Sequence, residues 1–294
     1  MPLESFETLT NGDLASIFFL VAAILFNLRK YMCSPRALFF DMWGMRISFS
    51  LFLAFLVNAV SEARRPLPLL VATVLLVIFL LESIRLWNLT GIFTELDVPI
   101  FPKFKQCEES FVWPVGKFFD EIRELIIARG FSEKVLLRLG GGEFFVMYSP
   151  IFYSNDQRSR LQIIFDSFHR GRTVLNCILT SYEKNGGTIV TNNLQTVFAS
   201  FYPKSWNIKR CPMISLEKLF DLHAHRISSV EITKIGDSSA WEAINSEHHQ
   251  IELENCRAGL CEKLDDNDHV TLAFPGRYHL WCDMLVFTYF GKNV

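Results

Sequence analysis

No charge of either sign dominates the chain, whose 294 residues carry 29 basic and 31 acidic side chains. The net charge of −2 excludes a broad electrostatic attraction to nucleic acid. Internal repeats, low-complexity tracts and long runs of one charge are also missing from the sequence. The chain therefore has none of the patterns that are typical of a repeat array or a charged tail.

A framework of paired cysteines is missing as well. The seven cysteines, an odd number, show no recurring spacing and are residues 33, 107, 177, 211, 256, 261 and 282. Secreted proteins that are stapled by disulfides usually carry an even number of cysteines at regular spacings. We therefore expect free thiols, and we expect Cys177 to pack within the apolar strand that contains it.

Motifs of nucleophilic catalysis and phosphate binding are not present. The sequence has no Gly-x-Ser-x-Gly elbow, and strand-forming residues follow Gly140–Gly142, where a phosphate loop would lead into a helix. The acidic stretch 262–268 lacks the central Gly and terminal Glu of a calcium loop. Its neighbouring acids Asp265 and Asp266 are expected to be solvated. We predict no catalytic residue.

The histidines and cysteines do not indicate a metal site. His223 and His225 fall about 200° apart around a helix, so they cannot hold one ion together. Cys256 and Cys261 are widely spaced without a second matching pair, and the histidines at 248–249 are adjacent to each other. We predict neither a metal ligand nor a cofactor.

Apolar residues are abundant, and they concentrate at the start of the chain. Three apolar runs of about 15 residues each lie in the first 87 residues, each shorter than the ~20 needed to span a bilayer. Their nearly uncharged flanks extend them to the predicted spans 13–29, 42–61 and 66–87. Arg46, Glu82 and Arg85 lie near the ends of these spans, where they can snorkel or pair. We predict a transmembrane anchor in residues 1–87, with a soluble helical core as the alternative.

Basic residues predict the orientation of the anchor. Those that follow the first and third spans are Arg29, Lys30, Arg36, Arg46, Arg85, Lys103 and Lys105. Only Arg64 and Arg65 lie between the second and third spans. The positive-inside rule therefore predicts an N-terminus outside and residues 88–294 in the cytoplasm. No basic stretch precedes the first run, so we expect it to be retained, either spanning the membrane or lying on its surface.

Four residues are predicted to lie at the membrane interface: Trp43, Trp87, Arg277 and Trp281. The first two fall at span ends, where interfacial tryptophans usually lie. The other two lie at the start of the apolar stretch 278–290, which is too short to span. That stretch is predicted either to rest on the membrane surface or to close the core of the soluble domain.

Residues 88–107 are a predicted extended linker, and residues 108–294 a soluble α+β domain. A helix is expected from Pro114 to Gly130, because apolar residues recur there at the helical period. Antiparallel strands are expected at 135–139, 143–151, 160–168, 173–183 and 188–191.

Turn and cap signals add detail to this domain. The Asn185-Gly186 pair predicts a tight hairpin between the last two strands, because both residues tolerate positive φ. Ser215 is a predicted cap of a helix whose Leu216, Leu219, Phe220 and His223 share a face. A further helix is expected from about 238 to 259.

Several short motifs in residues 89–226 carry a resemblance. They are Phe101-Pro102-Lys103-Phe104, Gly130-Phe131, the hairpin segment 187–193 and His225-Arg226. The order of these parts resembles a loosely defined group of membrane-anchored bacterial proteins without an assigned function. The resemblance implies a bacterial inner-membrane protein and implies no activity.

Three functions remain open. The first is a membrane-anchored non-catalytic module whose cytoplasmic domain binds a protein partner, a lipid headgroup or a small signal. The second is a membrane-surface enzyme acting on a lipid or lipid-linked substrate through histidines of the 223–249 region, which requires at least two of them in one pocket. The third is an oligomeric pore gated by the soluble domain.

Overall fold

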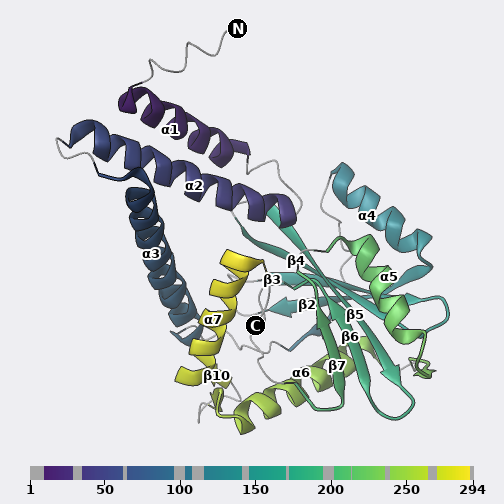
Figure 1. The fold of residues 1–294 in the computed structure, drawn as a ribbon. Coiled ribbons are helices and arrows are strands. Elements are labelled where there is room, and N and C mark those ends of the chain that lie inside the picture. Colours follow the sequence, from purple (N-terminus) through teal and green to yellow (C-terminus); the bar gives the residue numbers. More distant parts are fainter. Residues whose placement is uncertain are drawn as a thin grey trace. The chain divides into compact units, whose positions relative to one another are not determined.

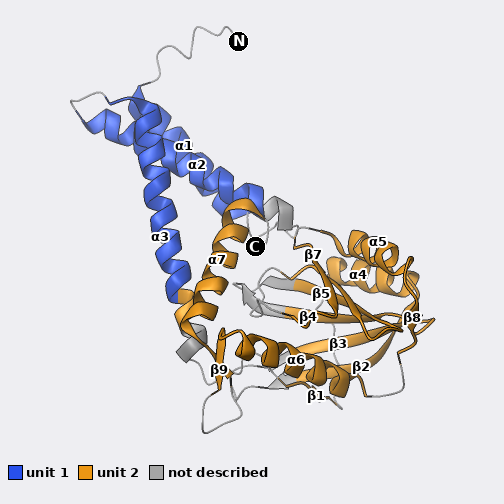
Figure 2. Ribbon diagram, turned by 60° about the horizontal axis from the view of Figure 1, so that its bottom comes forward, with its two compact units in different colours: residues 1–88 blue, residues 89–294 orange. Residues whose placement is uncertain are grey.

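The structure, a computed structural model, divides into two compact units, residues 1–88 and 89–294 (Figure 2). It describes residues 10–28, 35–61, 65–95, 103–107, 116–140, 146–169, 172–194, 202–212, 214–235, 239–263 and 270–291. Three long helices precede an eight-stranded, mostly antiparallel sheet with further helices. The predicted α+β class is confirmed.

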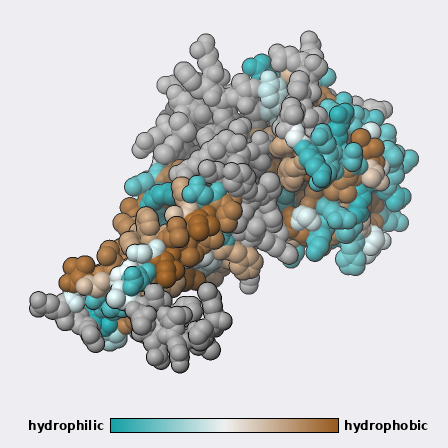
Figure 3. Space-filling view, turned by 90° about the horizontal axis from the view of Figure 1, so that it is seen from above, coloured by the Kyte–Doolittle hydropathy of each residue, from teal (hydrophilic) through white to brown (hydrophobic). Residues whose placement is uncertain are grey.

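The first unit contains helices long and apolar enough to cross a membrane: α1 (Asn11–Leu28), α2 (Pro35–Val60) and α3 (Leu67–Glu95). Of the 24 large apolar side chains that are exposed in the described residues, 19 lie on these helices. Figure 3 shows hydrophobic surface gathered over this unit and hydrophilic surface over much of the other. So much exposed apolar surface is stable in lipid rather than in water.

Helices α1 and α2 form an antiparallel pair. The ring centroids of Phe18 and Phe55 lie 5.7 Å apart, and those of Phe19 and Phe52 lie 5.2 Å apart. Gly44 permits a close approach further along, because a Cβ there would lie 3.1 Å from a methyl group of Leu25. Aromatic stacking and a small residue therefore hold the pair together, as expected where lipid removes the hydrophobic driving force.

Helix α3 continues beyond its predicted end. The extended chain expected from Leu89 is wrong as far as Glu95, because α3 is helical to that residue. Between Trp87 and Pro99 the sequence contains no proline, and a lone Gly91 is tolerated within a helix. The remainder of the linker, residues 96–102, lies outside the described residues.

The second unit is built on a sheet with the strand order β1-β2-β3-β4-β5-β6-β7, in which β8 also pairs with β5 (Figure 1). The strands are β1 (Lys105–Gln106), β2 (Phe131–Gly140), β3 (Val146–Ser154), β4 (Arg160–His169), β5 (Arg172–Glu183), β6 (Thr188–Asn192), β7 (Trp206–Arg210) and β8 (Ile232–Thr233). All neighbours are antiparallel except β6 and β7. A separate pair consists of β9 (Cys261–Lys263) and β10 (Val270–Leu272).

The five predicted strands are confirmed, as is the hairpin between β5 and β6. In that turn Gly186 has φ of 89°, whereas Asn185 keeps a negative φ. Gly186 therefore supplies the left-handed conformation of the turn. The strands that were not predicted, β1 and β7 to β10, have two to five residues, too few for a clear alternating pattern.

Helices cover both faces of the sheet. Helices α4 (Lys117–Ala128) and α5 (Leu216–Ile227) pack on one face, and α6 (Ala240–Arg257) packs on the other (Figure 1). The first core contains Ile122, Ile126, Phe152, Leu161, Ile163, Phe165, Cys177, Leu179, Leu216, Leu219 and Phe220. The second contains Phe104, Leu137, Ile151, Tyr153, Ile235, Ala240 and Ile244. Alternate residues of β3 and β4 therefore face different helices.

The helix ends follow from local chemistry. The Ser215 hydroxyl accepts a hydrogen bond from the Lys218 N–H at 3.5 Å, which confirms the predicted cap of α5. Gly130, with φ of 76°, ends α4 as predicted, whereas Pro114 lies outside the described residues. Helix α6 ends in a Schellman motif, in which Leu260 N–H donates to the Asn255 carbonyl and Gly259 has φ of 71°.

The last helix, α7 (Phe274–Phe290), closes a third core around β9 and β10. Its Leu280 packs with Leu260, Cys261, Val270 and Leu272. Phe274, Tyr278 and Phe290 of the same helix are exposed. The described contacts show the core-closing placement for one face of the stretch 278–290, and the membrane-surface placement stays a prediction for the rest.

Replacing Gly276 with Ala should dislodge α7 from β9 and β10. A Cβ at Gly276 would lie 2.1 Å from the Leu260 carbonyl oxygen, whereas Gly259 has φ of 71° but no atom within 4 Å of such a Cβ. We expect Gly276→Ala to cost at least about 3 kcal/mol and Gly259→Ala about 1 kcal/mol. Thermal unfolding of the detergent-solubilised chain tests this order, and equal losses would contradict it.

Candidate functional site

A buried histidine joins α5 to the sheet. His223 is 3% exposed, and its Nε2 lies 3.0 Å from the Ser181 hydroxyl of β5. Its Nδ1 lies 2.9 Å from the Thr191 hydroxyl of β6. Both hydroxyls are also buried, so each must find its partners within the protein. His223 was predicted to be a partly buried residue on a helix face, and the structure buries it fully.

The neighbouring Arg226 determines which ring nitrogen carries the proton. Its guanidinium donates to the Thr191 hydroxyl at 2.6 Å and to the Asn207 carbonyl at 2.6 Å. The Thr191 hydroxyl accepts from Arg226, so its own hydrogen is available to His223 Nδ1. We therefore assign the proton of the neutral imidazole to Nε2, which donates to Ser181.

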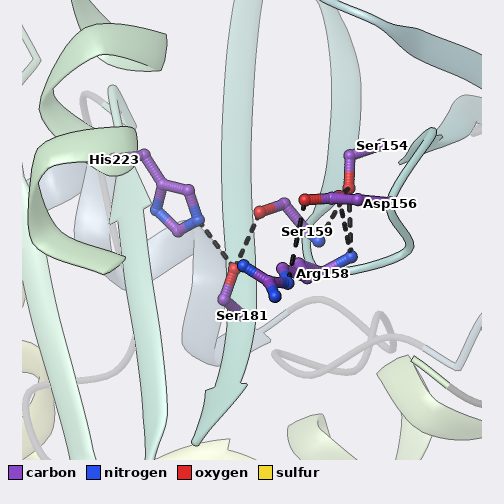
Figure 4. A network of polar contacts seen from close by, with 6 residues as sticks. All are labelled: Ser154, Asp156, Arg158, Ser159, Ser181 and His223. Atoms are coloured by element: carbon purple, nitrogen blue, oxygen red, sulfur yellow. Dashed lines mark hydrogen bonds and ion pairs between the residues drawn. The ribbon is translucent and has the colours of Figure 1, made fainter. Parts of the chain in front are cut away.

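The network continues into the turn between β3 and β4 (Figure 4). The hydroxyls of Ser181 and Ser159 lie 2.9 Å apart, and the Ser159 N–H donates to the Ser154 hydroxyl at 2.9 Å. Ser154 in turn donates to an Asp156 carboxylate oxygen at 2.6 Å. Although partial burial opposes ionisation, the bonds from Ser154 and the Arg158 N–H keep the pKa of Asp156 below its ordinary value.

A second polar cluster lies on the opposite face of the same strands, under α6. Arg160 is 2% exposed and donates to the Glu247 carboxylate at 2.5 Å and to the Tyr182 hydroxyl at 2.8 Å. Tyr182 also donates to Glu247. Burial opposes the charge on Arg160, but the attraction of Glu247 raises its pKa, whereas burial raises the pKa of Tyr182. The charge pair is thus retained inside the protein.

These clusters have the properties of structural contacts. Burial and the charge of Arg226 lower the pKa of His223 to about 4, so the imidazole is neutral at physiological pH. In the described part of the chain, His223 bonds to two hydroxyls and to no carboxylate that would orient it as a base. Burial also raises the pKa of the Cys177 thiol, which disfavours the reactive thiolate.

The other histidines that were considered as a group do not converge. His225 on α5 is exposed, whereas His248 on α6 lies beside Phe104 and His249 lies 3.7 Å from Glu252. Helices α5 and α6 lie on opposite faces of the sheet, so these imidazoles do not share a pocket. The described residues hold no group of three side chains suited to a metal ion. Asp265 and Asp266 lie outside them.

The cysteines in the described parts of the chain are free thiols, namely residues 107, 177, 211, 256, 261 and 282. Cys256 and Cys261 both belong to the core under α7. Burial raises the pKa of Cys256, and it raises that of Cys261 to about 12. Both thiols are therefore suited to packing rather than to nucleophilic attack.

The residues predicted to lie at the membrane interface fall on the long apolar helices α2 and α3 and on α7. Trp43 on α2 lies with its ring centroid 5.5 Å from the Arg46 guanidinium, and Trp87 is half-buried on α3. Trp281 packs beside Tyr278 at 5.6 Å on α7. Arg277 donates to the Thr90 hydroxyl at 3.3 Å, which fastens α7 to the last turns of α3.

An ion pair within the first unit joins α2 to α3. Arg46 is 6% exposed and its guanidinium lies 2.7 Å from a Glu82 carboxylate oxygen. Arg46 and Glu82 were expected either to snorkel or to pair, and the structure pairs them. Arg46 lies seven residues after the start of the candidate span Phe39–Val60. Because α2 begins at Pro35, Arg46 lies eleven residues after that start and fourteen before Val60. A charge well inside a membrane helix is expected to be paired, as this one is.

Sequence reasoning missed two further contacts that hold the second unit together. Arg210 of β7 forms a two-pronged ion pair with Asp283 of α7, at 2.9 Å for the shorter contact. The Asn245 side chain of α6 accepts from the Phe104 N–H and donates to the Phe104 carbonyl, both at 2.8 Å. For the contact between Asn245 and Phe104, the sequence gave one signal, which is the apolar Phe104 between two lysines.

The chain matches no protein-family model, no curated protein and no solved structure in the comparisons. The resemblance to a group of membrane-anchored bacterial proteins therefore stays a prediction. Functional inference from here depends on the geometry alone.

The buried imidazole should make stability depend on pH. His223 has a folded pKa of about 4 and an ordinary value of 6.5, so the unfolded chain binds a proton more readily between these limits. Stability is complete above pH 6.5 and falls by up to about 3 kcal/mol as the pH approaches 4. Thermal unfolding between pH 4 and 7 should show a flatter slope for His223→Gln. The exposed His225→Gln should keep the wild-type slope, and parallel slopes for all three proteins would refute this role.

The ion pair under α6 should be sensitive to the loss of either charge. Glu247→Ala leaves the Arg160 guanidinium buried without its carboxylate, which should cost about 3–5 kcal/mol. For a unit of this size, the midpoint of thermal unfolding should fall by roughly 10 °C. The exposed Glu242→Ala on the same helix is the matched control. Combining Glu247→Leu with Arg160→Met should recover most of the loss, and no recovery would contradict the ion-pair argument.

Proposed function

We propose that this protein is a membrane-anchored, non-catalytic module whose second unit binds a protein partner, a lipid headgroup or a small signal. The observation that carries the proposal is that His223 and its hydroxyl partners are buried and bonded to one another. The same holds for Arg160, Tyr182 and Glu247 under α6. Side chains with such contacts stabilise the fold, so recognition of a partner falls to residues on the surface.

The proposed location is the bacterial inner membrane, with the N-terminus outside and residues 88–294 in the cytoplasm. The charge asymmetry supports this orientation, although Arg46 and Arg85 lie inside the candidate spans Phe39–Val60 and Leu67–Gly91 and no longer count as flanking residues. The basic residues that remain on the proposed cytoplasmic side are Arg29, Lys30, Arg36, Lys103 and Lys105. Arg64 and Arg65 oppose them, so the asymmetry persists.

The enzyme alternative receives less support. It requires at least two histidines of the 223–249 region to lie in one pocket at the membrane. In the described residues these histidines lie on helices that cover opposite faces of the sheet, and His223 is bonded to Ser181 and Thr191. A pore would consist of several copies of the chain. The number of chains in the native complex therefore distinguishes a pore from the module.

The mass of the intact chain, extracted gently from its own membrane, tests the proposed function. We expect a retained protein or signal molecule at fixed stoichiometry, because a non-catalytic module acts by holding a partner. His225→Ala, His249→Ala and Cys256→Ala should retain that partner to within about twofold, since none of these side chains acts as a catalyst in this proposal. A symmetric homo-oligomer without a bound partner would favour a pore. Loss of the protein's function in the histidine variants would favour an enzyme.

A further inference from the structure

Two cations face each other at the edge of the sheet. Lys105 of β1 is directly opposite Arg138 of β2 in the antiparallel register, and both side chains are exposed. Like charges in directly opposite positions are unfavourable in a strand pair. In the described residues neither cation forms an ion pair with an acid, whereas many other basic residues do. Among the residues that the structure describes, no acidic side chain therefore serves as a counterion to this pair.

Protection of the sheet edge explains only half of this arrangement. Lysines on short edge strands prevent pairing with other chains, and β1 is a two-residue edge strand that carries Lys105. Arg138 lies on β2, however, and β1 already covers that edge of β2. A second cation adds repulsion without adding protection, which indicates an anion outside the protein.

The strand that carries Lys105 is held rigidly. Phe104 is 2% exposed in the core under α6, and Asn245 binds both its N–H and its carbonyl. On the other side of Lys105, the Cys107 N–H donates to the Leu136 carbonyl at 2.9 Å. The two cations are therefore presented at a set spacing, and little backbone entropy is lost when they bind a ligand.

The membrane is within reach of this edge. The candidate span of α3 ends at Gly91, the helix ends at Glu95, and β1 begins ten residues later. A rise of 1.5 Å per helical residue and at most ~3.5 Å per extended residue puts Lys105 within about 40 Å of the span end along the chain.

We propose that Lys105 and Arg138 bind anionic lipid headgroups of the bilayer in which the chain is anchored. This proposal deepens the proposed function and depends on its membrane anchor. Each cation near an anionic surface contributes about a fivefold factor in affinity, which is weak for a free protein. Tethering makes the encounter intramolecular, so two cations suffice to dock the sheet edge on the bilayer.

Hydrogen exchange of the full-length chain in nanodiscs tests the proposal. With about 30% anionic lipid, peptides covering 103–107 and 131–140 should exchange more slowly than in purely zwitterionic discs. Raising the salt to about 0.5 M should abolish the difference, because it screens exposed charges. The double variant Lys105→Gln with Arg138→Gln should weaken docking roughly 25-fold and lose the lipid dependence.

A matched control keeps the net charge change the same. Lys218 and Lys234 are exposed and lie away from β1 and β2 in the chain, so Lys218→Gln with Lys234→Gln should keep the full lipid dependence. Exchange that is independent of lipid in the wild type, or equal loss in the control pair, would overturn the proposal. Protection by inorganic phosphate in zwitterionic discs would assign the cations to a soluble anion and also overturn it.

The outcomes separate this site from the proposed anchor. A chain that does not incorporate into the discs would contradict the anchor and the headgroup site together. A chain that incorporates but shows no lipid-dependent protection would contradict the headgroup site alone. A third outcome combines two results: the double variant self-associates, and exchange in the wild type does not depend on lipid. It would contradict the headgroup site and would mean that the two cations protect the sheet edge from pairing.

Discussion

Covering a sheet with helices on both faces removes water from many polar side chains on its central strands. Each such group must then find its partner inside the protein, because an unpaired buried polar group is costly. Polar side chains of β4 and β5 find such partners on both faces of the sheet. His223 of α5 bonds to Ser181 on one face, and Glu247 of α6 bonds to Arg160 on the other. The positions of both helices depend on these contacts as much as on the apolar cores.

The membrane half obeys the same constraint more strictly, because lipid offers no alternative hydrogen-bond partner. Arg46 lies well inside α2, and its bond to Glu82 joins two helices that follow each other in the chain. Aromatic stacking between Phe18 and Phe55 holds α1 against α2. Polar bonding and apolar packing thus hold different pairs of the three helices.

The elements with long, regular patterns were predictable. Three apolar helices, five strands and the Ser215 cap follow from hydropathy, alternation and capping chemistry, all of which act over a few residues. The short strands β1 and β7 to β10 were missed, because short strands such as β1 and β7 exist only through their neighbours. The continuation of α3 to Glu95 was also missed, although Gly91 is tolerated within a helix.

The sequence by itself determined that the chain has an apolar helical front and an α+β back, because helix and strand periodicities are local properties. It also determined the charge asymmetry from which an orientation is proposed. Only the tertiary structure decided which titratable groups are buried and what each one bonds. It placed His223 beside Thr191, separated the histidines of α5 and α6, and set Lys105 opposite Arg138. These pairs join residues that lie far apart in the chain, and their approach is decided by packing rather than by any local pattern.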